Sequence, residues 1–191
     1  MWKLAERYER YIKDKKDFSL HMEKVYRLTN HNDTVVEIGG QFGIGSSTAF
    51  AMARPAHLIC IDILKQDKFE SFLTACEYEG INVEYWIMDS LETTVPPCDI
   101  LFIDSYHTYE QLKQELSLHG NKSRKYLIFH DTATYCCGNT GQDAKSPGLL
   151  AAINEFKAVN SQWCEVYKTE ECNGLIILLN SNSLSLEKEG K

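Results

Sequence analysis

The chain has 191 residues, of which 43% are hydrophobic and 25% are charged. These proportions exclude the disordered, collagen-like and coiled-coil classes, and the length predicts one globular domain with a packed core. The 20 Lys and Arg residues and 27 Asp and Glu residues give a net charge of −7. This balance argues against a broad nucleic-acid-binding face, which needs clustered positive charge, so we expect a small-molecule partner and no nucleic acid.

The compartment is predicted from the first residues and from the cysteines. The N-terminal segment is charged and lacks the apolar run of a signal peptide, and no apolar stretch approaches the roughly 20 residues of a membrane span. The seven cysteines are odd in number, which favours reduced thiols over a disulfide framework. We therefore expect a cytoplasmic protein without a membrane partner. The adjacent Cys136 and Cys137 have no second pair at zinc-finger spacing, so we interpret them as loop thiols.

The first 30 residues are charge-rich, with apolar side chains at helical spacing that are interrupted around Asp17 and Phe18. They predict two short helices. We expect residues 1–30 to form a helical cap on a domain that spans residues 1–180, followed by a flexible polar tail at 181–191. The aromatic residues Trp2, Tyr8 and Tyr11 of the first helix could face the core or a second copy of the chain, so a homo-oligomer stays open.

Beyond the cap, β-branched apolar runs alternate with helical stretches. The predicted strands are 34–38, 57–61, 82–88, 99–103, 126–129, 165–168 and 175–179, and the predicted helices begin at Ser46 or cover 68–79, 109–118 and 149–159. Such alternation is typical of a parallel sheet with helices on both faces. The connection 169–174 is too short for a crossover helix, so the last two strands should be antiparallel. We predict an α/β, Rossmann-like, doubly wound and mostly parallel sheet of about seven strands with a C-terminal antiparallel hairpin strand.

A glycine-rich turn, EIGGQFGIGS at positions 37–46, follows the first predicted strand. Glycines at this place let backbone N–H groups approach a ligand closely. Their spacing does not match the G-x-G-x-x-G fingerprint of dinucleotide-binding proteins. The turn predicts a nucleotide site of another kind, although a turn that serves only packing would show the same glycines.

Two acidic residues end the next two predicted strands. Asp62 follows the second strand, where a carboxylate can accept hydrogen bonds from both ribose hydroxyls, and its alternative role is to cap a helix. Asp89 follows the third strand, where this kind of fold lines an adenine pocket, and it could equally cap a turn. An acid at position 62 together with the glycine turn is more specific than either feature alone.

The fourth and fifth strands deliver two polar pairs, Asp104 with His107 and His130 with Asp131. Because the carboxyl ends of neighbouring parallel strands meet at one edge of the sheet, we expect the four side chains to lie close together. Imidazoles and carboxylates can bind a divalent metal or transfer protons, and the sequence does not choose between these roles. Each histidine alone could also be a helix cap or a satisfied buried group.

Together these segments resemble class I S-adenosylmethionine-dependent methyltransferases, within them the small-molecule O-methyltransferases and the cephalosporin-hydroxylase-like group. The similarity spans about residues 34–179. The matching residues are Glu37-Ile38-Gly39, Gly43, Ser46-Ser47-Thr48, Ile103-Asp104, His107, Tyr109-Glu110 and His130-Asp131-Thr132.

The resemblance implies methyl transfer from S-adenosylmethionine to an oxygen of a small hydroxylated metabolite. It implies a cofactor site formed by Glu37, Gly39, Gly43, Ser46, Asp62, Asp89 and Asp104, and a catalytic group of His107, His130 and Asp131. The metal ligands of some relatives, which bind Mg²⁺, correspond to Asp104, His130 and Asp131, so Mg²⁺ or Mn²⁺ is a candidate cofactor. Relatives have an acid where this chain has His130, which leaves a His/Asp acid–base pair as the alternative.

Two loop features accompany the resemblance. Relatives have Gly-Gly before the fifth strand, where this chain has Ser123-Arg124-Lys125, and we expect this difference to affect only the turn. The segment 132–148 is long and contains glycines, so we interpret it as a substrate lid that covers the acceptor together with the N-terminal helices.

Two other function classes stay open. A nucleotide-dependent oxidoreductase could use the same kind of sheet, but the glycine spacing and the closing hairpin disfavour it, and NAD(P)H binding would support it. A non-catalytic module could keep the S-adenosylmethionine pocket without a productive acceptor site. Binding without turnover would support that module.

Overall fold

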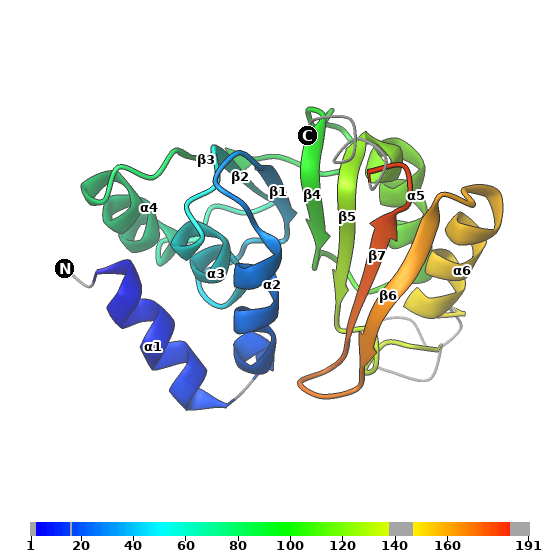
Figure 1. The fold of residues 1–191 in the computed structure, drawn as a ribbon, viewed down its shortest axis with the longest axis horizontal. Helices are drawn as coiled ribbons and strands as arrows, with labels where there is room; N and C mark the ends of the chain where they lie inside the picture. Colours follow the sequence, from blue (N-terminus) through cyan, green and yellow to red (C-terminus); the bar gives the residue numbers. More distant parts are fainter. Residues whose placement is uncertain (1–2, 16, 138–146, 184–191) are drawn as a thin grey trace, which may run out of the picture. The chain divides into compact units, whose positions relative to one another are not determined.

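The computed structural model describes residues 3–15, 17–137 and 147–183. The chain forms two compact units, residues 1–93 and residues 94–191, and both contain strands and helices (Figure 1). The predicted single domain over residues 1–180 stays a prediction. Among the described residues, none of the helices is both long and apolar enough to cross a membrane.

The first unit has the predicted helical start and three parallel strands. Its elements are α1 (Leu4–Asp14), the short 3₁₀ helix η1 (Asp17–His21), α2 (Met22–Leu28), β1 (Thr34–Ile38), α3 (Ser46–Met52), β2 (His57–Asp62), α4 (Phe69–Tyr78) and β3 (Val83–Ile87). Strand β2 pairs in parallel with β1 and with β3. The valine, isoleucine and leucine side chains of β1 and β2 are almost fully buried, as are Phe50, Phe69 and Phe72 of the neighbouring helices. This burial makes the unit's core and holds the carboxyl ends of the strands in place.

The second unit combines a parallel strand pair with an antiparallel hairpin. Its elements are β4 (Cys98–Ile103), α5 (Tyr109–His119), the 3₁₀ turn η2 (Gly120–Lys122), β5 (Ser123–His130), α6 (Leu149–Val159), β6 (Trp163–Thr169) and β7 (Leu175–Asn180). Strands β4 and β5 are parallel, whereas β7 is antiparallel to both β5 and β6. The strand order β3-β2-β1-β4-β5-β7-β6 confirms the predicted fold class, including the C-terminal antiparallel hairpin.

The predicted tail begins with an anchored turn. The Ser181 amide donates to the Gln162 carbonyl at 2.8 Å, and the Ser183 hydroxyl donates to the Asn180 carbonyl at 2.7 Å. These bonds join residues 181–183 to Gln162, which precedes β6, and to the end of β7, and the flexible polar tail from residue 181 stays a prediction. Residues 184–191 lie outside the described residues.

The segment Ser123-Arg124-Lys125 is the start of β5 and not only a turn. Buried Asp99 of β4 accepts two hydrogen bonds from the Arg124 guanidinium, at 3.1 and 2.8 Å, and lies 3.6 Å from the Lys125 ammonium. The Ser123 hydroxyl donates to the Asp99 carbonyl at 3.1 Å. The expectation that this segment affects only the turn is wrong, because its residues belong to β5 and contact Asp99 of β4, where the strand pairing shifts register.

The glycine turn after β1 packs against α4. Gly43 has a φ of +63°, and a Cβ atom there would lie 2.5 Å from the Phe72 Cβ. Such a distance leaves no room for any side chain. The phenyl ring of Phe72 therefore sets how closely the turn approaches α4.

We expect Gly43→Ala to destabilise the fold more than Gly80→Ala. Gly80 has a similar φ of +69°, but nothing lies within 4 Å of an added Cβ. Both substitutions force alanine into a left-handed conformation at a cost of about 1–2 kcal/mol. Only Gly43→Ala adds overpacking, which costs about 1–3 kcal/mol more. Urea denaturation measures both free energies of unfolding, and equal losses would contradict the tight contact with Phe72.

Candidate functional site

Hydrogen bonds tie the glycine turn to the end of β2 in the first unit. The Gly39 amide donates to the Ile61 carbonyl at 2.8 Å, and the Gln41 amide donates to one carboxylate oxygen of Asp62 at 2.9 Å. The other carboxylate oxygen accepts the Leu64 amide at 3.0 Å. Helix α4 begins only at Phe69, so Asp62 does not cap it. The Asp62 carboxylate is thus oriented by two backbone donors beside the turn.

Glu37 lies beneath the turn and is fully buried. Its carboxylate accepts the Ser47 hydroxyl at 2.6 Å and the Cys60 thiol at 3.1 Å. Burial, together with the charge of Glu37, raises the pKa of the Cys60 thiol well above its usual range. These contacts join β1, α3 and β2, so Glu37 positions the turn from below. Ser46, the first residue of α3, is also buried.

Asp89 shows the capping geometry that the sequence allowed as its alternative role. Its carboxylate accepts the Leu91 amide two residues on, at 2.8 Å. This contact closes the turn after β3. The side chain is half-buried, and its predicted contact with an adenine stays a prediction.

The second unit brings Asp104, His107, His130 and Asp131 together, as the sequence predicted, at the carboxyl ends of β4 and β5. The Nε2 atom of His107 lies 3.0 Å from Asp104 Oδ1 and 3.1 Å from Asp131 Oδ2. The Nδ1 atom of His130 lies 3.2 Å from Asp104 Oδ2 and 3.4 Å from Asp131 Oδ1. Each imidazole therefore faces both carboxylates. We call these four side chains the His–Asp cluster.

The two histidines differ in exposure and in their second contacts. The His130 side chain is 1% exposed, against 17% for His107. The His130 Nε2 atom lies 3.0 Å from the Cys172 carbonyl oxygen, so both ring nitrogens of His130 face oxygen acceptors. His130 thus organises the carboxylates from the buried side, whereas His107 is the more accessible base.

The cluster shifts the protonation of its members. Burial alone would raise the pKa of Asp104, but hydrogen bonds from His107 and His130 and their charges lower it to about 2. Burial alone would lower the pKa of His107, but the hydrogen bond to Asp104 and the charges of Asp104 and Asp131 outweigh burial and raise it. An ionised Asp104 beside a readily protonated His107 is a pairing that suits proton transfer.

A part of the cluster fits a divalent cation. Asp104, His107 and Asp131 each offer a ligand atom, and these three atoms lie within 4.8 Å of one another. Carboxylate oxygens suit Mg²⁺ and Mn²⁺, and imidazole is a common ligand for transition metals. The histidine of this set is His107. The resemblance implied a metal site with His130 in its place, and that site stays a prediction.

The sequence did not predict two contacts of the cluster. The Tyr135 ring stacks on the His107 ring, with centroids 4.6 Å apart and planes at 8°. The Cys172 carbonyl oxygen lies within hydrogen-bond distance of His130 Nε2. Both depend on the turn after β5, where Asp131 has a φ of +58° and the Ala133 amide donates to the Asn173 carbonyl at 2.8 Å. An aromatic residue a few positions after the His-Asp pair was the only signal in the sequence.

Residues 138–146 of the predicted lid lie outside the described residues. On either side of them, the Leu149 amide donates to the Tyr135 carbonyl at 2.9 Å. Cys136 and Cys137 are free thiols, with sulfur atoms 3.1 Å apart. The predicted lid function stays a prediction.

Solved methyltransferase structures share this architecture. The O-methyltransferase TomG from Streptomyces achromogenes, solved with SAM, is 16% identical with a TM-score of 0.61, and the match covers 85% of this chain and 80% of TomG. An O-methyltransferase from Bacillus cereus, solved with SAH, is 16% identical with a TM-score of 0.61, covering 93% and 90% of the two chains. The fold is that of Rossmann-like methyltransferases.

An N-methyltransferase has the same fold. NodS from Bradyrhizobium japonicum, solved with S-adenosyl-L-homocysteine, is 14% identical with a TM-score of 0.57, and the match covers 94% of this chain and 99% of NodS. No protein-family model matches the chain, and a search of curated proteins found no match. The structural likeness therefore confirms the fold implied by the resemblance, and the site residues carry the argument about chemistry.

We expect Asp104→Asn to lower the pKa of His107. The variant removes one of the two negative charges that stabilise the imidazolium, whereas burial still disfavours it. Histidine-ring NMR in the presence of a chelator measures this pKa, which should exceed the ordinary value of about 6.5 in the wild type. The stability that the protonated His107 contributes is fully present below its ordinary pKa and is lost as the pH rises through its raised pKa. Asp67→Asn, at an exposed acid, is the control. Unchanged titration of His107 in Asp104→Asn would contradict the described pairing.

Proposed function

We propose that the chain is an S-adenosylmethionine-dependent methyltransferase that acts on an oxygen of a small hydroxylated metabolite. The observation that carries the proposal is the His–Asp cluster at the carboxyl ends of two adjacent parallel strands, the edge where such folds place their chemistry. The shared fold with methyltransferases and the glycine turn beside Asp62 support it. The turn's spacing disfavours the dinucleotide fingerprint.

The first unit would hold the methyl donor. Each carboxylate oxygen of Asp62 accepts one backbone N–H group, and each oxygen has further lone-pair capacity for a ribose hydroxyl. Gly39, with a φ of +92°, lets the backbone of the turn approach a nucleoside without a side chain in between. When bound, S-adenosylmethionine supplies an electrophilic methyl group.

The His–Asp cluster would remove the acceptor's proton. His107 Nε2, which faces Asp104 and Asp131, would hold a proton between them, and Nδ1 would accept the hydroxyl proton as the acceptor oxygen forms its new bond to carbon. The two carboxylates stabilise the resulting imidazolium. General base catalysis contributes about 10²–10⁴-fold. His130 would hold both carboxylates in place from the buried side.

The same cluster would accommodate a divalent ion as an aid to this reaction. Asp104, His107 and Asp131 would hold Mg²⁺ or Mn²⁺, which lowers the pKa of a bound hydroxyl. In that case, the two carboxylates would neutralise the ion's charge. A chelator then distinguishes the two modes, because it abolishes only the metal-assisted reaction.

We expect His107→Gln to reduce methyl transfer by about 10²–10⁴-fold, because the glutamine amide cannot act as a base for the acceptor's hydroxyl proton. Mass spectrometry would follow S-adenosylhomocysteine formation with a panel of sugars, phenols and other hydroxylated metabolites, each with and without Mg²⁺ and chelator. His31→Gln, an exposed histidine whose ring contacts the Arg54 carbonyl, is the control. Full activity of His107→Gln would contradict the assigned base, and donor binding without turnover of any acceptor would favour a non-catalytic module.

We expect Asp62→Ala to weaken S-adenosylmethionine binding by about 10–100-fold, the scale of lost charged hydrogen bonds. Titration calorimetry measures this affinity, with Asp67→Ala as a matched control at an exposed acid in the same loop. Thermal unfolding of both variants separates lost binding from lost folding. Tighter binding of NAD(H) than of S-adenosylmethionine by the wild type would instead favour an oxidoreductase.

A further inference from the structure

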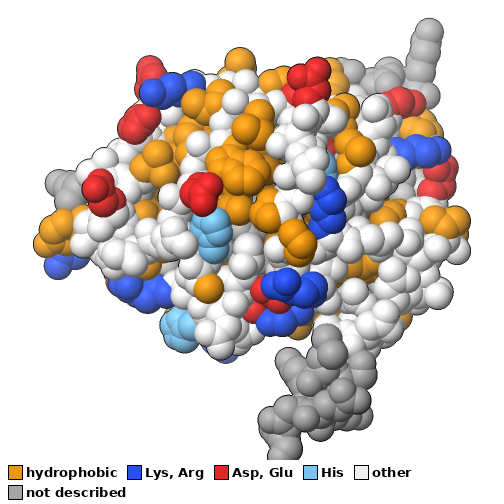
Figure 2. Space-filling view, turned by 90° about the horizontal axis from the view of Figure 1, so that it is seen from above, with side chains coloured by type: hydrophobic (Ala, Val, Ile, Leu, Met, Phe, Trp, Pro, Cys, Tyr) orange, Lys and Arg blue, Asp and Glu red, His pale blue; other side chains and the backbone are white. Residues whose placement is uncertain are grey.

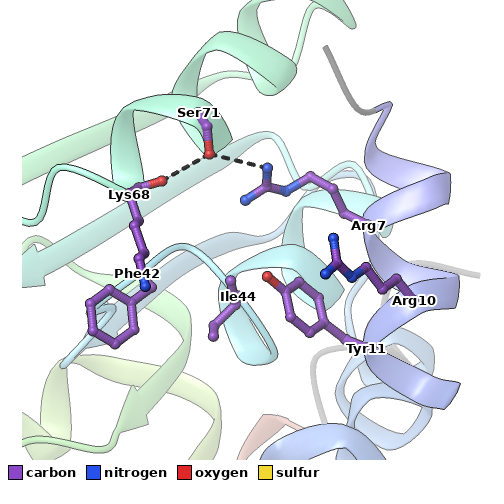
Figure 3. A pocket seen from close by; sticks show the side chains of 7 residues that line it. All are labelled: Arg7, Arg10, Tyr11, Phe42, Ile44, Lys68 and Ser71. Atoms are coloured by element: carbon purple, nitrogen blue, oxygen red, sulfur yellow. Dashed lines mark hydrogen bonds between the residues drawn. The ribbon is translucent and has the colours of Figure 1, made fainter. Parts of the chain in front are cut away.

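A pocket lies in the first unit, between α1, the glycine turn and the start of α4 (Figure 3). Its cavity measures about 310 Å³. Arg7, Arg10 and Tyr11 of α1 line one wall, and Phe42 and Lys68 line the opposite wall. Neither Asp62 nor any member of the His–Asp cluster lines it, whereas Phe42 of the glycine turn does.

The lining of this pocket is strongly basic in an acidic protein. It contains three cationic side chains and no carboxylate, although the chain has a net charge of −7. Basic and acidic side chains are interspersed on the face shown in Figure 2. A concentration of positive charge around one cavity therefore points to an anion.

Arg7 gives the clearest sign that an anion belongs here. Its guanidinium donates to the Ser71 hydroxyl at 3.3 Å and to the Gly43 carbonyl at 3.4 Å, both neutral acceptors. The buried Nε atom has no hydrogen-bond partner among the described residues. Burial partly removes the Arg7 guanidinium from water and so lowers its pKa. An anionic ligand would offset the cost of this desolvation.

The aromatic walls indicate what the anion is attached to. The Lys68 ammonium lies 5.1 Å from the centroid of the Phe42 ring, and the Tyr11 ring approaches from the other side with its hydroxyl toward the cavity (Figure 3). The measured volume is at the lower end of ligand pockets, about 300–1,000 Å³. Three cations favour a dianion, and arginine forks match phosphate oxygens.

We propose that this pocket binds the phosphate group of a small, ring-bearing phosphate monoester. Arg7, Arg10 and Lys68 would neutralise the phosphate, and the ring would lie between Phe42 and Tyr11. Since Arg7 also contacts the Gly43 carbonyl, the ligand would be linked to the glycine turn. This site does not depend on the proposed methyl transfer, and the failure of either proposal leaves the other standing.

Titration calorimetry of the full chain with phenyl phosphate tests the proposal. We expect saturable binding of phenyl phosphate, weaker binding of inorganic phosphate and no binding of phenol. Arg10→Gln and Lys68→Gln should each weaken phenyl phosphate binding by about tenfold, the effect of one charged hydrogen bond. Lys13→Gln is the matched control, because this cation lies on the same helix but 3.9 Å from Glu9 and outside the pocket lining.

Three results would overturn the proposal. The first is absence of saturable phenyl phosphate binding at millimolar concentration. The second is an equal loss of affinity in Lys13→Gln, which would reveal only a general effect of surface charge. The third is competition between phenyl phosphate and S-adenosylhomocysteine in the wild type, which would make the pocket a part of the methyl-donor site.

Discussion

The hydrogen bond from the Gln41 amide to the Asp62 carboxylate joins the glycine turn to the end of β2. The turn needs glycine at position 43, where the Phe72 ring of α4 leaves no space for a side chain. Glu37 supports the turn from below through Ser47 and Cys60. Because the interior fixes the turn on two sides, its backbone and one oriented carboxylate are presented together at the strand ends. The proposed nucleoside site depends on this constraint.

The His–Asp cluster follows from a different constraint, the balance of charge in a largely buried place. Two carboxylates so close together would repel each other, and two imidazoles compensate them. The low pKa of Asp104 and the raised pKa of His107 are the two sides of this compensation. A protonated imidazole or a divalent ion can supply the required positive charge. The same geometry is therefore compatible with proton transfer and with metal assistance.

Sequence patterns predicted the first and last residues of an element well where residues within or next to that element determine them. Strand β1 and helix α6 have the predicted bounds, because apolar runs and adjacent turn residues mark them. Strand β5 starts at Ser123 instead of residue 126, because its first residues are held by Asp99, which lies far away in the sequence. Contacts of this kind leave no periodic signal.

The candidate site was predictable to a similar degree. The position of polar residues after parallel strands brings Asp104 and Asp131 to one edge, and this could be inferred from topology. The stacking of Tyr135 on His107 could not, since it depends on the left-handed turn at Asp131. The basic pocket was also missed, because the spacing of apolar residues in α1 says nothing about which charged face meets α4.

In the proposed methyl-donor site, the glycine turn and Asp62 bind the nucleoside. The most direct measurement is an amide ¹H–¹⁵N NMR titration of the full chain with S-adenosylhomocysteine. We expect saturable shifts that are largest at residues 39–45, at Asp62 and at Leu64, because the Leu64 amide donates to the Asp62 carboxylate. Saturable shifts that leave these residues unchanged, or no saturable shifts at all, would contradict it.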